Sequence, residues 1–149
     1  MKLKKTISKG LLGVMTFMTL SSAGTMTAKA APETDDTIFG GYYNGYSSVT
    51  TTWRFKTNNT SVYVLNSDSP CGVYVDIKGG TAIKVPGVPN QVTNVQDCNY
   101  SGAYTLVGQG QSKKIANTVY EKGLNACRLY LTGTQLNVNL SGWWSPDSI

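Results

Sequence analysis

Short runs in which apolar and polar residues alternate recur along the chain, and they constrain its fold more than any other feature. Residues 71–78 alternate Cys, Val, Val and Ile with Gly, Tyr, Asp and Lys, and residues 127–132 alternate Cys, Leu and Leu with Arg, Tyr and Thr. A period of two residues places one set of side chains on each face of a strand. Each of these runs therefore predicts a half-buried β-strand.

Similar signals cover most of the chain after residue 37. The run 49–57 alternates, with Val49, Thr51, Trp53 and Phe55 expected on the buried face. Shorter strands are expected over 61–65, 81–85, 92–95 and 104–107. The segment 109–123 combines helical spacing with strand-forming residues, and we favour a strand there.

Turn-forming residues predict how the strands connect. Asn44–Gly45 is typical of a tight hairpin turn, because both central residues of such a turn need positive φ. Gly133–Thr134 is expected to join the run 127–132 to the run 136–140 in a final hairpin. Seven to nine short strands of this kind predict an all-β fold, either a small antiparallel β-sandwich or an open barrel.

Residues 1–30 have the pattern of a cleaved signal peptide. Lysines at positions 2, 4 and 5 precede an apolar stretch over 11–20, which is shorter than the roughly twenty residues that span a bilayer. Small residues at Ala28 and Ala30 predict cleavage before Ala31. We therefore expect a secreted, extracellular protein without a stable membrane anchor. The alternative is that this segment is retained as a membrane anchor. A flexible leader over 31–37 and a single domain over 38–149 should follow.

The basic charge of the chain belongs to its N-terminal segment. Five of the 13 basic residues and none of the eight acidic residues lie in residues 1–30, which leaves eight of each in the exported part. A net charge of zero argues against a nucleic-acid partner and against attraction to anionic lipid.

Three cysteines, an odd number for an exported protein, predict one disulfide and one remaining thiol. The candidates are Cys71, Cys98 and Cys127, and the sequence leaves all three pairings open. A monomer with a buried free thiol is favoured over a disulfide-linked dimer.

The chain contains no histidine, which removes the usual catalytic triads and the commonest ligand of zinc and copper. No cofactor and no metal site are expected, since the acidic turns lack the spacing of a calcium loop. A pair of carboxylates is the remaining catalytic option. The acids outside the leader stand alone in the sequence, so we expect no enzyme; they are Asp68, Asp76, Asp97, Glu121 and Asp147.

Two groups of aromatic residues are candidates for binding. Tyr42, Tyr43 and Tyr46 surround one predicted turn, and Trp143 and Trp144 lie near the C-terminus. Exposed aromatic rings stack on sugars or fill pockets in a partner. Adjacent residues of a strand point to opposite faces, so at least one of the two tryptophans should belong to the core.

Both ends of the chain resemble a family of small exported proteins from Gram-positive, Bacillus-like bacteria. The similar stretches are residues 31–36, residues 119–129 and residues 141–148. The resemblance implies export and a small domain. The family has no established activity, so the resemblance assigns no catalytic residues.

These observations favour a non-enzymatic binding or effector module that contacts protein or glycan at the cell surface. Two alternatives remain: a secreted antibacterial or inhibitor protein, and a small glycan hydrolase. The hydrolase requires two carboxyl groups within about 10 Å of each other.

Overall fold

The computed structural model describes residues 35–83 and 91–148, which form ten strands and no helix, so no helix of this part could cross a membrane. The strands are β1 (Thr37–Tyr43), β2 (Val49–Thr50), β3 (Arg54–Phe55), β4 (Val62–Leu65), β5 (Val73–Ala82), β6 (Val92–Asp97), β7 (Thr105–Val107), β8 (Ser112–Ile115), β9 (Ala126–Gly133) and β10 (Val138–Ser145). The predicted signal peptide lies outside the described residues.

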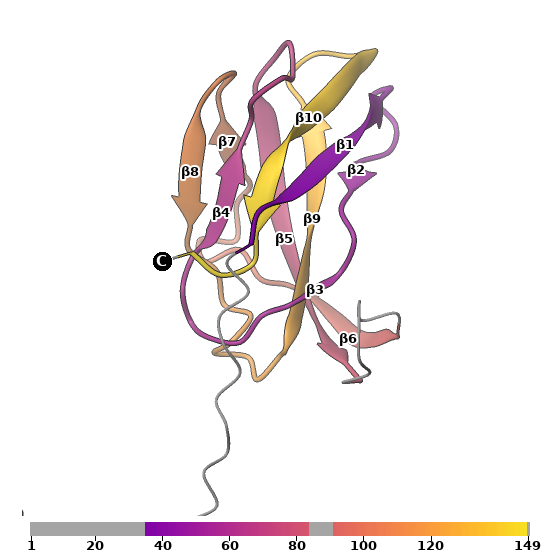
Figure 1. The fold of residues 1–149 in the computed structure, drawn as a ribbon. Coiled ribbons are helices and arrows are strands. Elements are labelled where there is room, and N and C mark those ends of the chain that lie inside the picture. Colours follow the sequence, from indigo (N-terminus) through magenta and orange to yellow (C-terminus); the bar gives the residue numbers. More distant parts are fainter. Residues whose placement is uncertain (1–34, 84–90, 149) are drawn as a thin grey trace, which may run out of the picture.

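The strands form two antiparallel sheets, which confirms the predicted all-β sandwich (Figure 1). The first sheet has the order β1-β10-β4-β8, and the second has the order β2-β9-β5-β6, with β3 also pairing with β9 and β7 with β5. The longest ladder joins β5 to β9, where eight residues of each strand are in register. This central pair positions most of the features described below.

The core lies between the sheets and is built from alternate residues of their strands. In β5, Val73, Val75 and Ile77 are fully buried, and Leu129 and Leu131 of β9 lie beside them. The first sheet contributes further large side chains, including Phe39, Val62, Val64, Leu140 and Trp144. Burial of apolar surface at about 25 cal/mol per Å² makes this layer the main source of stability.

Both predicted hairpins are wrong. β1 pairs with β10 and β2 pairs with β9, so the Asn44–Gly45 turn carries the chain from one sheet to the other. Gly45 has the positive φ that the turn needs, whereas the Asn44 side chain accepts hydrogen bonds from the backbone of Tyr46 and Ser47. β9 and β10 likewise lie in different sheets. Turn residues indicate where a chain reverses, but they do not select the strand with which it pairs.

The run 49–57 is not one continuous strand. It divides into β2 and β3, and Lys56, which the alternation places on the polar face, is 2% exposed. The expectation that Trp53 faces the core is also wrong, because its ring packs against Arg128 on the outer side of the second sheet. In the ambiguous segment 109–123, β8 confirms a strand over residues 112–115, whereas residues 119–123 form a turn that ends at Gly123 with a φ of 70°.

Lys56 is buried because it binds the C-terminal end of the chain. Its ammonium donates hydrogen bonds to the carbonyl oxygens of Thr60 and Pro146, at 2.6 and 2.7 Å, and to Asp147 Oδ1 at 2.8 Å. Asp147 Oδ2 in turn accepts hydrogen bonds from the backbone and hydroxyl of Thr57. All three ammonium donors are therefore satisfied inside the protein, which fits a structural role for both residues.

Candidate ligand-binding face

The three predicted tyrosines lie at the end of β1, and they do not form one cluster. Tyr46 is 94% exposed and Tyr42 is 60% exposed, whereas Tyr43 packs against the core. The Tyr42 hydroxyl donates a hydrogen bond to Asn137 Oδ1 at 3.2 Å. Two of the three rings therefore stand in solvent near this turn.

The two tryptophans point to opposite sides of the first sheet, as predicted. Trp144 is fully buried in the core, and Trp143 is 38% exposed on the outer side. Trp143 is paired with Ile38, and Tyr42 is paired with Asn139 four residues farther along each strand. Four residues of a strand span roughly 13 Å, so the structure does not bring Trp143 and the tyrosines together.

A denser group of aromatic and polar side chains lies on the outer side of the second sheet. The residues of β5 and β9 that alternate with the core point outward there, and the register pairs Tyr74 with Thr132, Asp76 with Tyr130, and Lys78 with Arg128. Trp53 and Tyr104 border the same surface. We call these eight residues the aromatic face: Trp53, Tyr74, Asp76, Lys78, Tyr104, Arg128, Tyr130 and Thr132.

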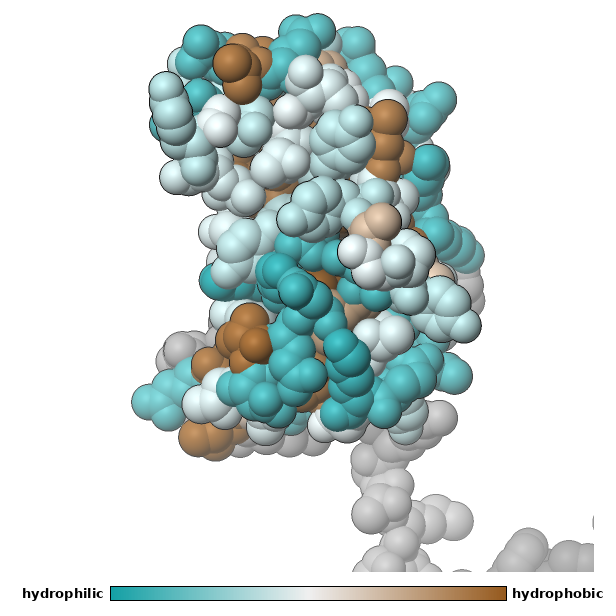
Figure 2. Space-filling view, turned by 180° about the vertical axis from the view of Figure 1, so that it is seen from behind, coloured by the Kyte–Doolittle hydropathy of each residue, from teal (hydrophilic) through white to brown (hydrophobic). Residues whose placement is uncertain are grey.

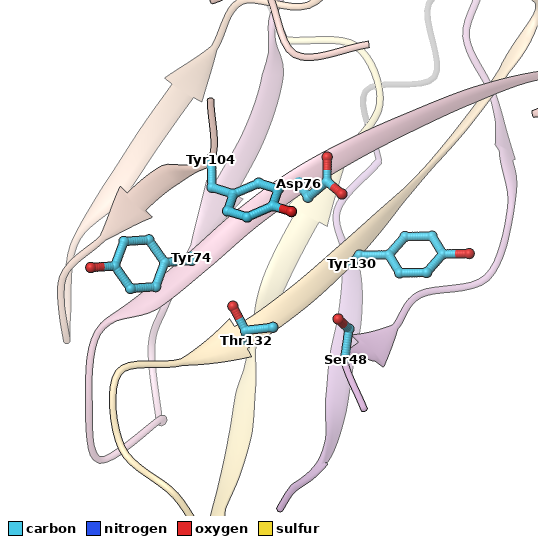
Figure 3. Close-up of a pocket in the computed structure, with 6 residues that line it drawn as sticks. All are labelled: Ser48, Tyr74, Asp76, Tyr104, Tyr130 and Thr132. Carbon is cyan, nitrogen blue, oxygen red and sulfur yellow. The ribbon is translucent and has the colours of Figure 1, made fainter. Parts of the chain in front are cut away.

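The centre of the aromatic face is a small hollow lined by Ser48, Tyr74, Asp76, Tyr104, Tyr130 and Thr132. Figure 3 shows the rings of Tyr74 and Tyr104 on one side and Tyr130 on the other, with the carboxylate and hydroxyl groups between them. Tyr74 is 40% exposed and Tyr104 is 65% exposed. Flat rings and polar groups are therefore available to a ligand at the same place.

Cation–aromatic contacts border the hollow on the side of Tyr130. The Arg128 guanidinium lies 4.7 Å from the ring centres of both Trp53 and Tyr130, and its Nη2 donates a hydrogen bond to the Tyr130 hydroxyl. The Lys78 ammonium lies 5.6 Å from the Tyr130 ring centre. Contacts of this kind contribute about 0.5–2 kcal/mol each and restrict the Tyr130 side chain.

Two carboxylates approach each other beside the hollow. Asp76 and Asp97 both form ion pairs with the Lys78 ammonium, which brings their carboxyl groups within about 6 Å of each other. The Asp97 side chain is 74% exposed, whereas Asp76 also accepts a hydrogen bond from Asn99 at 2.5 Å. The spacing required of a glycan hydrolase is thus met by one pair, although a lysine stands between its members.

The exposed side of the second sheet is mostly polar or intermediate in hydropathy. Figure 2 shows pale and teal residues over its middle, with hydrophobic residues confined to separate spots nearer the edges. Such a surface differs from the continuous apolar patches that mark obligate protein interfaces.

The sequence indicated the outward positions of this face without indicating that they meet. Tyr74, Asp76 and Lys78 alternate with core residues in one run, and Arg128, Tyr130 and Thr132 do so in another. About fifty residues separate the two runs, and only the pairing of β5 with β9 makes them neighbours. The one signal in the sequence is that both runs alternate in the same way and carry a tyrosine among their outward residues.

The expected disulfide is absent from the structure. Cys71, Cys98 and Cys127 all have free thiols, and all three are buried. Burial raises the pKa of Cys98, and it raises the pKa of Cys127 to about 12. Thiols in such surroundings are poor nucleophiles at neutral pH, so none is a candidate catalytic residue.

Within residues 35–83 and 91–148, no three acidic or cysteine side chains converge as metal ligands. The sequence pattern of a family described as "Protein of unknown function (DUF2712)" matches residues 26–148. No curated protein and no solved structure matches the chain.

Proposed function

The chain belongs to the DUF2712 family, whose description assigns no function, and we propose that it is a non-enzymatic extracellular module that binds a glycan at the cell surface. The family match confirms membership in an uncharacterised family. The bacterial origin and the export of the chain stay predictions. The aromatic face is the proposed binding surface.

The observation that carries the proposal is the hollow between Tyr74, Tyr104 and Tyr130. A sugar ring presents C–H groups on its faces and hydroxyl groups around its edge. Aromatic rings stack on the apolar faces, and the hydroxyls need polar partners. The exposed rings of Tyr74 and Tyr104 supply the first requirement, and Asp76, Ser48 and Thr132 supply the second.

The arrangement of the hollow favours recognition of a chain over enclosure of a small molecule. Small-molecule sites usually bury most of the ligand, whereas this hollow on the face of a sheet is too small to enclose one. A polysaccharide can extend across such a face and contact the outward side chains of both β5 and β9. The cation–aromatic contacts of Arg128 restrict the surface before binding, which lowers the entropic cost of association.

Binding is favoured over hydrolysis by the position of Lys78. A glycosidase needs one carboxylic acid that donates a proton and one carboxylate. The Lys78 ammonium forms an ion pair with each of Asp76 and Asp97, so it stands between the two carboxylates. The close approach of these two carboxylates nevertheless makes hydrolysis the second candidate, and it predicts release of reducing sugar by the wild-type protein and its loss in D76N.

Retention on insoluble cell-wall polysaccharide tests the proposal. Tyr104→Ala removes an exposed ring from the hollow, and we expect the apparent affinity to fall about fivefold or more, since a stacked ring contributes roughly 1 kcal/mol or more. Tyr42→Ala removes a similarly exposed ring from the other sheet and serves as the matched control. Equal binding by wild type and Y104A, or loss of binding in Y42A alone, contradicts the assignment. Capture of a protein with no retention on glycan supports the alternative of a secreted antibacterial or inhibitor protein instead.

A further inference from the structure

The inner side of the β5–β9 pair holds two of the three thiols on the same face. Cys98 follows β6, and its backbone is held by hydrogen bonds to Ile77 and from Thr118, both of 2.9 Å. Its side chain points to Gly79 of β5, where a Cβ atom would lie 2.6 Å from Cys98 Sγ. The sulfur therefore fills the space in which any other residue at position 79 would have its side chain.

Cys127 is the cross-strand partner of Gly79. The register of β5 and β9 places the two residues directly opposite each other. Side chains of such partners point to the same side of the sheet, with Cβ atoms roughly 5 Å apart. Cys98 Sγ occupies the side-chain position of Gly79, so it lies next to the Cys127 side chain. A disulfide requires the two Sγ atoms to lie about 2 Å apart, and rotation of each side chain about its Cα–Cβ bond moves the two sulfurs toward each other from this arrangement.

Cys71 cannot take part in this pair. It lies eight residues before Gly79 along the chain, just ahead of β5. Eight residues of an extended strand span roughly 26 Å, whereas a disulfide requires Cα atoms within about 7 Å. Both of the other cysteines are fixed beside Gly79, so Cys71 is too distant from each of them.

We propose that Cys98 and Cys127 are the redox pair of this domain, and that oxidation joins them in a disulfide while Cys71 keeps its thiol. Each cysteine loses its proton, one S–S bond forms, and two electrons pass to a low-molecular-weight disulfide, which is reduced to two thiols. One cysteine first forms a mixed disulfide with the small thiol. The thiolate of the other cysteine then attacks this bond and releases the small thiol. This site is independent of the proposed glycan binding.

The surroundings of the pair indicate when the bond forms. Cys98 and Cys127 are both 0% exposed, and a mixed disulfide with a bulky thiol has no room in the closed core. Burial also raises the pKa of both thiols, which makes thiolate scarce at neutral pH. Oxidation therefore accompanies folding, before the core around Gly79 closes, and the finished disulfide is protected from reductants.

Peptide mapping of the full chain after refolding in oxidised and reduced glutathione tests the pairing. Trypsin places each cysteine on its own peptide, residues 57–78, 85–113 and 123–128. After alkylation of the remaining thiols, we expect peptide 85–113 joined to peptide 123–128, and peptide 57–78 alkylated. A link to peptide 57–78, or alkylation of all three cysteines in the refolded protein, overturns the proposal.

Single variants separate the pairing from a general folding defect. Cys71→Ser should form the same link in the same yield, and the linked protein should unfold at a higher temperature than its reduced form. Cys98→Ser should leave Cys127 alkylated, and a Cys71–Cys127 link in that variant contradicts the geometry. Gly79→Ala should lower the yield of the link several-fold, because its Cβ would lie 2.6 Å from Cys98 Sγ.

Discussion

The ammonium of Lys56 and the carboxylate of Asp147 lie 2.8 Å apart, and both side chains are completely enclosed. Lys56 comes from the start of the domain, just after β3, and Asp147 from its C-terminal end after β10. The pair ties the segment after β3 to the segment after β10. Removal of one member leaves an uncompensated charge in the core, a change that typically costs 3–5 kcal/mol.

Asp147→Asn should therefore lower the free energy of unfolding by about 3–5 kcal/mol, because the substitution keeps the shape of the side chain and removes its charge. Urea unfolding followed by tryptophan fluorescence measures the change. Asp68→Asn, at an exposed turn, is the matched control and should change stability by less than about 0.5 kcal/mol. Equal stability of D147N and wild type would show that the ion pair is not buried in solution.

Gly142 allows β10 to pass close to β4 and to the Phe39 ring. A Cβ atom at this position would lie 2.1 Å from the Leu65 carbonyl oxygen and 2.6 Å from Phe39 Cζ. Gly142→Ala should destabilise the protein by about 1–3 kcal/mol or more, because the backbone must move. At Gly40, on the exposed side of β1, a Cβ would lie 3.7 Å from the nearest atom, so Gly40→Ala should fold as wild type does. Thermal unfolding of the two variants measures the difference, and equal losses in both would contradict this packing.

The buried thiol of Cys127 makes the stability of the reduced protein dependent on pH. Burial raises its pKa from 9.0 to about 12, so the native state keeps this proton after the unfolded chain has lost it. The contribution of this protonated thiol to the free energy of unfolding is complete below pH 9. It is lost as the pH rises toward 12, at about 1.4 kcal/mol per pH unit. We expect Cys127→Ala to flatten this part of the stability curve. Identical slopes for the two reduced proteins between pH 9 and 11 would contradict the burial of the thiol.

Local patterns predicted the strands well because alternation directly reflects burial on one face of a sheet. The runs 71–78 and 127–132 correspond to most of β5 and β9, and the opposite orientations of Trp143 and Trp144 follow from the same rule. The pairing of strands was not predictable, because the turn after Gly133 can connect strands in one sheet or in two. Lys56 was misplaced for a related reason, since its partner Asp147 lies 91 residues away.

The candidate site depended on this missing information. The three predicted tyrosines are close together in the sequence, and so are the two tryptophans, but Tyr42 and Trp143 lie apart on the first sheet. Tyr74, Tyr104 and Tyr130 come from three separate segments and meet only through the pairing of β5 with β9 and β7. Likewise, Cys98 and Cys127 come together only because Gly79 leaves room for the Cys98 sulfur and is the cross-strand partner of Cys127.

NMR titration of the isotopically labelled protein with soluble cell-wall glycan fragments tests the central proposal most directly. If the aromatic face binds glycan, the shifted amide signals will cluster on the outward residues of β5, β7 and β9, including Tyr74, Tyr104 and Tyr130. The signals of Tyr42 and Trp143 on the first sheet should stay unchanged. Shifts confined to the first sheet, or no shifts at saturating glycan concentrations, would contradict the proposal.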